Sequence, residues 1–119
     1  MSIQDDFFED LAVAFDSWVA SSSDALTNTD ANLIWIDKPE YFEKVRSALN
    51  QSGITSDDVK QVISEIISGV LVSMLTTIDG GTYLAEKNLI KLVDEQGQSL
   101  GSDLHNDFML YLMETGRLE

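Results

Sequence analysis

Apolar residues recur at helical spacing at the start of the chain. On a 3.6-residue wheel, residues 3–20 gather their large apolar side chains on one arc and their acids on the other side. Ser2, followed three positions later by Asp5, has the form of a capping box and predicts a helix start. The serine run 21–23 weakens this helix, so we expect it to end there and to be followed by a loop. The short apolar run 33–36 then predicts a strand or helical turn under the core.

A second helix is predicted between Pro39 and Gly53. Proline is accepted in the first turn of a helix, and glycine is typical of the position after its end. Between them, Phe42, Val45 and Leu49 recur at helical spacing, so we expect them to form a buried stripe.

The clearest helix start in the chain lies at Thr55, which can cap the helix, with Asp58 three positions later. Apolar residues continue from there to Ile78, and after Ile66 they surround the helix axis, which is typical of a helix buried on all sides. A Gly-Gly pair after residue 79 stops the pattern. The sequence therefore predicts a buried central helix over 56–78.

Residues 82–100 can be interpreted in two ways. The apolar residues 89–93, the polar turn residues 94–97 and Leu100 predict a strand, a turn and a short return strand. Residues 82–87 could equally begin a helix. We favour a small β-hairpin near 89–100.

A last helix is predicted to begin at Ser102 and Asp103 and to end at Gly116, with a stripe formed by Leu104, Phe108 and Leu112. Together the elements predict a mainly α fold, a compact bundle of about four helices around the buried central helix 56–78. At 119 residues the chain has close to the commonest domain size and needs no disulfide or metal to form a core. We expect one acidic globular domain over 1–119.

Charge narrows the choice of partners. The net charge is −14, and eight carboxylates precede Lys38, the first basic residue. Such a surface repels nucleic acid and anionic membranes and attracts cationic proteins. We therefore expect a basic protein partner, no nucleic acid and no membrane. The acids of the predicted first helix are the first choice for its binding site: Asp5, Asp6, Glu9, Asp10 and Asp16.

A second choice for the partner site combines the acidic turn Asp94–Glu95 with Trp35 and Tyr83. The two aromatic residues lie near predicted turns, where a half-exposed amphipathic ring suits an interface. Loops carry binding residues more often than scaffold helices do, which is the reason for including this turn.

His105 is the sole histidine and stands between Asp103 and Asp107. On a helix, residues two apart do not share a face, so we expect the two aspartates to face together and His105 to point elsewhere. One imidazole without any cysteine cannot assemble a zinc site of the usual kind. No nucleophile or phosphate-loop motif is present either. We therefore expect no catalytic residues, no metal and no cofactor, and a protein that is not an enzyme.

The N-terminus has no basic and apolar leader pattern, which speaks against a secretion signal. The longest uncharged apolar stretch, Ile66 to Ile78, has 13 residues, whereas a membrane span needs about 20. With no cysteine in the chain, the sequence favours a cytoplasmic protein.

In length, acidity and lack of cysteine, the chain resembles the bacterial immunity proteins that neutralise toxins. The resemblance is one of overall profile and implies an inhibitor that blocks a basic toxin, such as a nuclease, through an acidic surface. Two alternatives remain open. One is a structural or regulatory homodimer that pairs through the central helix or the Phe7/Phe8 face. The other is a small-ligand domain with a pocket between helix and hairpin.

Overall fold

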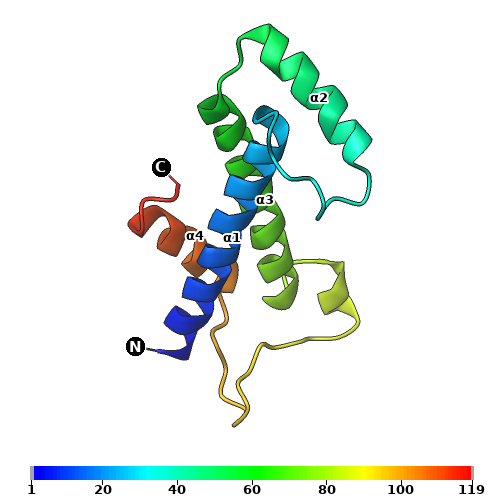
Figure 1. Cartoon of the computed structure of the whole chain (residues 1–119). Coiled ribbons are helices and arrows are strands. Elements are labelled where there is room, and N and C mark those ends of the chain that lie inside the picture. The colour runs from blue at the N-terminus through cyan, green and yellow to red at the C-terminus, as the bar shows by residue number, and fades with distance from the viewer. Residues whose placement is uncertain (1, 119) are drawn as a thin grey trace. The chain divides into compact units, whose positions relative to one another are not determined.

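The computed structural model describes residues 2–118, which are mainly helical (Figure 1). Its elements in chain order are α1 (Ile3–Thr27), α2 (Pro39–Ser52), α3 (Ser56–Ile78), a 3-10 helix η1 (Tyr83–Glu86) and α4 (Leu104–Glu114). The mainly α fold class predicted from the sequence is confirmed, as is the span of the helix over 56–78.

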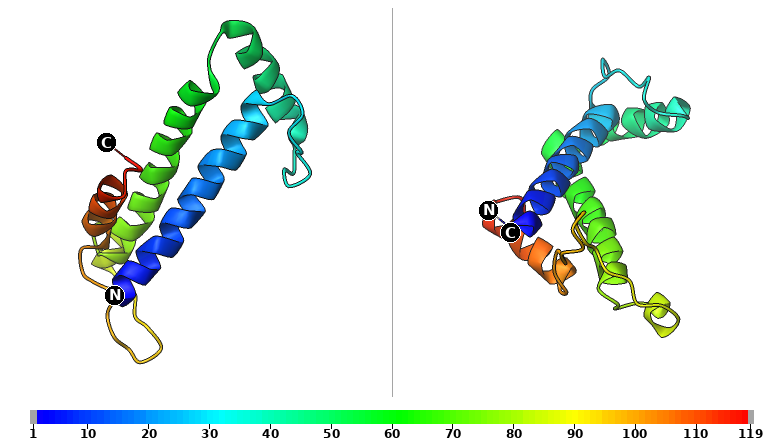
Figure 2. Two further views of the ribbon diagram at one scale, coloured as in Figure 1. Left: turned by 60° about the vertical axis from the view of Figure 1, so that its left-hand side comes forward. Right: turned by 90° about the horizontal axis from the view of Figure 1, so that it is seen from below.

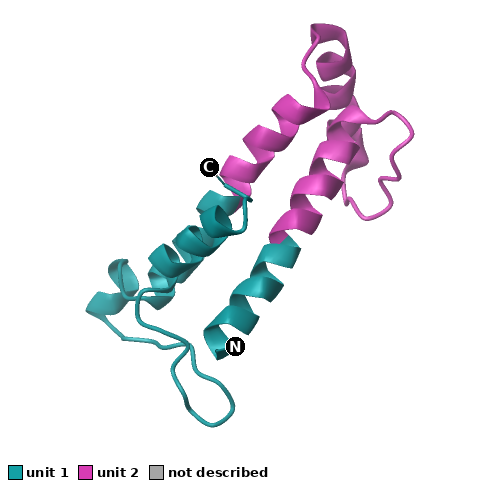
Figure 3. Ribbon diagram, turned by 90° about the vertical axis from the view of Figure 1, so that its left-hand side faces the viewer, with its two compact units in different colours: residues 1–14, 68–119 teal, residues 15–67 magenta. Residues whose placement is uncertain are grey.

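The chain divides into two compact units (Figure 3). Unit 1 contains residues 1–14 and 68–119, and unit 2 contains residues 15–67. Helices α1 and α3 each run from one unit into the other. Unit 1 is therefore built from two separate pieces of the sequence, whereas unit 2 is one continuous piece.

Both predicted capping boxes are present. The backbone N–H of Asp5 donates to Ser2 Oγ at 3.1 Å, and the Ser2 hydroxyl donates to Asp5 Oδ2 at 2.9 Å. At the start of α3, the N–H of Asp58 donates to Thr55 Oγ1 at 3.1 Å, and the N–H of Thr55 donates to Asp58 Oδ2 at 3.0 Å. Each box satisfies N–H groups that the first turn of a helix leaves without a partner.

The first helix is longer than predicted. We expected it to end at the serine run 21–23, but α1 continues to Thr27. The hydroxyl of buried Ser23 donates back to the carbonyls of Val19 and Ala20 at 2.8 and 3.2 Å. Because its own helix satisfies this hydroxyl, Ser23 does not compete with the helical hydrogen bonds, and the helix continues.

In unit 2, α2 begins at Pro39 and is followed by Gly53, whose φ of 79° is the left-handed conformation typical of the residue after a helix end. The predicted buried stripe of α2 is wrong, because none of its residues is buried and Val45 is exposed. The run 33–36 is also not tucked under a core: Ile34 is 87% exposed. Helical spacing identifies the face of a helix that could be covered, but it does not supply a neighbour to cover it.

The core of unit 1 joins α4 to the first half of α1. Leu104, Phe108 and Leu112 are fully buried, as the predicted stripe requires. The ring of Phe8 lies 5.3 Å from that of Phe108 and 5.8 Å from that of Tyr111, measured between centroids. Figure 2 shows from two further sides how α4 lies beside the start of α1.

The start of α1 is also tied to the loop before α4. Gln4 Nε2 donates to the carbonyl of Leu100 at 3.0 Å and to Asp107 Oδ2 at 3.2 Å. This one side chain therefore bridges the N-terminal helix to the loop and the first turn of the last helix.

The predicted burial of α3 is wrong. Its buried residues are Val59, Ser68 and Leu75. Of the other large apolar side chains on the helix, four are exposed and the rest are half-buried; the exposed ones are Val62, Ile66, Val70 and Met74. By length and composition alone, the stretch Ser56–Glu86 would be long and apolar enough to cross a membrane, and 11% of its most apolar window is buried. Apolar residues on every side of α3 therefore do not indicate that other elements pack against every side of it.

The hairpin is reduced to a single bridge. Val93 and Ser99 form one isolated antiparallel bridge, and no strand is formed within residues 2–118. The N–H of Leu100 donates to the carbonyl of Leu92, and that of Asp94 donates to the carbonyl of Gln98. The alternative helical interpretation of residues 82–87 is met in part by η1, a single turn.

Candidate functional site

The five acids chosen from the sequence are all exposed on α1. The helix carries no lysine or arginine, so no basic residue of its own lies among them. We call this set of side chains the acidic face: Asp5, Asp6, Glu9, Asp10 and Asp16. Their spacing places Asp16 between Asp5 and Glu9 on the helix wheel, with Asp6 and Asp10 further round.

One member of the acidic face also has a structural role. Asp5 holds Ser2 in the capping box, and both Asp5 and Asp6 lie in the first turn of α1. Carboxylates there interact favourably with the positive end of the helix dipole. Glu9, Asp10 and Asp16 lie beyond the first turn, and they therefore make the better probes of binding.

Trp35 lies in an exposed aromatic cluster of unit 2. Its ring centroid is 5.7 Å from that of Trp18 and 6.3 Å from that of Phe42, both in edge-on geometry. Trp35 and Trp18 both remain about half exposed. The contacts fix the orientation of Trp35 while leaving an aromatic surface, the kind of surface that protein interfaces favour.

The other second-choice residues belong to unit 1. Tyr83 is exposed in η1, with the amine of Lys87 5.4 Å from its ring centroid. Asp94 Oδ1 accepts hydrogen bonds from the N–H groups of Gln96 and Gln98 at 3.0 and 2.8 Å. Asp94 therefore shapes its own turn, and the exposed Glu95 is the member of this pair that faces solvent.

Sequence reasoning missed the role of Asp79. This residue follows α3 directly, yet its carboxylate caps the start of α4. Its Oδ1 accepts from the N–H of Leu104 at 3.0 Å, and its Oδ2 accepts from the N–H of His105 at 2.8 Å. His105 Nδ1 lies 2.5 Å from the same Oδ2. No local spacing signals a pair separated by 26 positions.

The expectation for His105 is corrected in one respect. Its ring lies 3.6 Å from Asp103 Oδ1 and does not point away from it, because Asp103 is the residue before the helix and the spacing rule for helical faces does not apply there. Asp107, which was expected to face Asp103, instead accepts a hydrogen bond from Gln4.

Asp79 is held in its charged form. Its side chain is 4% exposed, and desolvation alone would raise its pKa. The hydrogen bonds from the His105 ring and from the N–H groups of His105 and Leu104, together with attraction to the imidazole, outweigh that effect and lower the pKa below the ordinary value. The carboxylate is therefore a structural anion that joins the end of α3 to the start of α4.

Within residues 2–118, the same residues with Asp103 form a cluster that could hold a metal ion. Ligand atoms of Asp79, Asp103 and His105 lie within 4.8 Å of one another. Both oxygens of Asp79, however, already accept hydrogen bonds from the start of α4. These hydrogen bonds, with the His105 ring on the same carboxylate, account for the nearly buried position of Asp79, so we assign this cluster a structural role.

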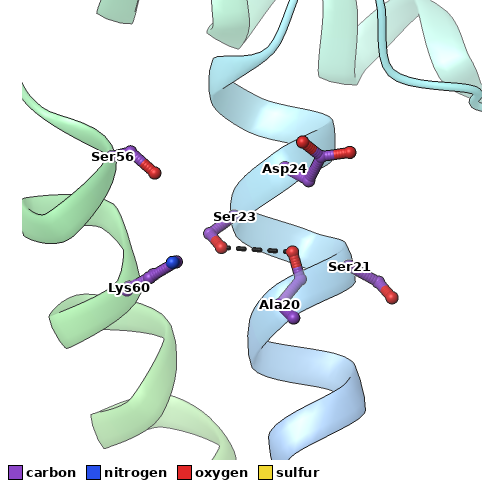
Figure 4. A pocket seen from close by; sticks show the side chains of 6 residues that line it. All are labelled: Ala20, Ser21, Ser23, Asp24, Ser56 and Lys60. Atoms are coloured by element: carbon purple, nitrogen blue, oxygen red, sulfur yellow. Dashed lines mark hydrogen bonds between the residues drawn. The ribbon is translucent and has the colours of Figure 1, made fainter.

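Each unit has a surface pocket that could admit a small molecule. One of about 410 Å³ lies in unit 2 between α1 and α3, lined by serines and by Asp24 and Lys60. Figure 4 shows the Lys60 amine directed from α3 toward α1. The other, of about 230 Å³, lies in unit 1 between the end of α3 and the segments 89–91 and 99–102, with Lys91 in its lining.

Comparison with known proteins finds no matching family model, no matching curated protein and no matching solved structure.

Proposed function

We propose that this protein is a non-catalytic binding protein that holds a basic protein partner on the acidic face of α1. The partner class that fits best is a basic bacterial toxin, such as a nuclease, which would make the protein an immunity-type inhibitor acting in the cytoplasm. The observation that carries the proposal is that all five acids remain exposed on one helix without a basic residue.

The physical argument concerns the encounter of the two proteins. A nuclease must be cationic where it meets phosphate, and an anionic helix blocks that surface while raising the association rate. The net charge of −14 extends the attraction beyond the contact itself. Trp35 and Trp18 offer an exposed aromatic surface on which an arginine-rich partner could be anchored.

The test is inhibition and association kinetics against a panel of basic bacterial nuclease toxins. Replacing Glu9, Asp10 and Asp16 by lysine should slow association with the cognate toxin by about tenfold or more and reduce its salt dependence. These positions avoid the capping box, so the helix should still form.

A matched control reverses three exposed glutamates outside α1, namely Glu43, Glu86 and Glu114. This control changes the net charge by the same amount but should slow association much less. Equal effects of the two triple variants would show that net charge alone acts. An unchanged rate in the α1 variant would place the binding site elsewhere.

A further inference from the structure

One face of α3 is apolar and exposed. Val62, Ile66, Val70 and Met74 follow one another at intervals of four residues, and each is between 55% and 59% exposed. Residues four apart form a continuous ridge along a helix, and this one is about 18 Å long. The exposed residues Gly69 and Ser73 lie in the neighbouring row. We call these six residues the α3 face.

Gly69 has no explanation within the chain. It lies inside a helix, where glycine is less favourable than any residue except proline, and it does not adopt a positive φ. A Cβ built at this position would meet nothing within 4 Å. The described residues therefore do not require glycine here, whereas the close approach of another helix backbone would.

We propose that the α3 face is the contact surface of a homodimer in which α3 packs against α3 of a second copy. The ridge lies beside the shallow row of Gly69 and Ser73, which forms a groove. The ridge of each copy can therefore pack into the groove of the other copy. This is the self-complementarity of a twofold interface. Packing of rows with a spacing of four residues gives helices that cross at about −50°.

The lack of charge on this part of α3 favours a second copy as the occupant of the α3 face. Between Glu65 and Asp79, α3 carries no charge, so two copies can meet there without burying an ion. The Phe7/Phe8 alternative is weaker because Phe8 is already buried against α4. By length and composition the helix could also cross a bilayer, so the experiment below tests lipid as the alternative occupant.

The dimer should be reversible. A standard interface buries about 800 Å² per partner, and four half-exposed side chains supply roughly half of that area. Two copies of charge −14 also repel each other, so added salt should strengthen the dimer. Binding of a basic partner would weaken under the same conditions. This inference does not depend on the proposed function, and the opposite salt responses distinguish the two.

The test is sedimentation velocity over micromolar to millimolar protein, at low and moderate salt. The wild type should shift from monomer to dimer with concentration, and at lower concentration when salt is added. Gly69→Leu should weaken dimerisation by about tenfold or more, because the side chain fills the groove. Its fold should be kept, since the position is open in the monomer. Ser47→Leu, which places the same side chain on the exposed part of α2, should leave dimerisation unchanged.

The results of these experiments distinguish a second copy from a lipid surface as the occupant of the α3 face. A wild type that stays monomeric throughout overturns the proposal. A Gly69→Leu variant that associates as tightly as the wild type or more tightly also overturns the proposal. That result would mean that added apolar area promotes association without any groove at Gly69. Stronger binding of that variant than of the wild type to phosphatidylcholine vesicles, without dimerisation of either, would identify the face as a lipid contact instead.

Discussion

Asp79 shows how one side chain can join two helices that lie far apart in the sequence. Its carboxylate follows α3 and accepts the first N–H groups of α4, 25 and 26 positions later. The N–H groups at a helix start need acceptors, and an anion there also meets the positive end of the helix dipole.

Removal of this acceptor should destabilise the protein. We expect Asp79→Ala to lower the free energy of unfolding by about 2 kcal/mol, because a nearly buried, charged cap is lost. His105→Ala should cost less, since both backbone hydrogen bonds to Asp79 remain. Urea denaturation of the two variants measures the difference. Equal losses would show that the imidazole contact, and not the cap, is the main contribution.

The contribution of Asp79 should depend on pH in a defined direction. Its pKa in the folded protein is lower than the ordinary value, so its stabilising effect is complete above the unfolded-state pKa of about 3.9 and is lost as pH falls through the folded-state pKa. The difference in unfolding free energy between wild type and Asp79→Asn should therefore be present at neutral pH and shrink in strong acid. A difference that grew on acidification would contradict the assignment.

At the scale of elements, the two sides of α3 should respond differently to truncation. Leu75 is buried, so Leu75→Ala should cost about 2–4 kcal/mol in unfolding free energy. Val70 on the same helix is exposed, and Val70→Ala should stay within about 0.5 kcal/mol in dilute, monomeric protein. Thermal or urea unfolding of this pair checks the orientation of the helix. Similar losses at both positions would mean that the exposed face is covered.

What the sequence could predict follows from how local each signal is. The capping boxes at Ser2 and Thr55, the bounds of α3 and the buried stripe of α4 all depend on residues within a few positions of one another. Burial of α2 and α3 depends on neighbours from other elements, which spacing does not reveal. The contact between Asp79 and His105 was not predicted for the same reason, since the two residues come from different elements.

The candidate partner site was predictable only in part. Exposure of the α1 acids follows from their place on the polar side of the helix wheel, and the structure agrees. The capping role of Asp5 is also visible in the sequence. The aromatic cluster of Trp18, Trp35 and Phe42 is not, because it joins α1, a turn and α2. The exposed face of α3 was not predicted, because apolar residues on every side of a helix were taken to indicate burial on every side.

At the scale of the whole molecule, the net charge of −14 should make stability depend on salt. Repulsion among the acids opposes folding, and at about 0.15 M salt the screening length falls to about 8 Å. The melting temperature should therefore rise as NaCl is increased from low to moderate concentration, measured in dilute protein so that self-association does not contribute. A steady fall would mean that favourable ion pairs outweigh the repulsion.

Because unit 1 is built from two separate pieces of the sequence, it cannot fold completely until both pieces have been synthesised. Phe8 is covered by α4, and Gln4 is bound to Leu100 and Asp107, all of which are made much later. At roughly 5–20 residues per second, the ribosome needs about 5–20 s after residue 14 to reach α4. During that interval the apolar side of the newly made first helix has no cover from α4. Unit 2, being continuous, can close as it emerges, whereas unit 1 can be completed only after α4 has been made.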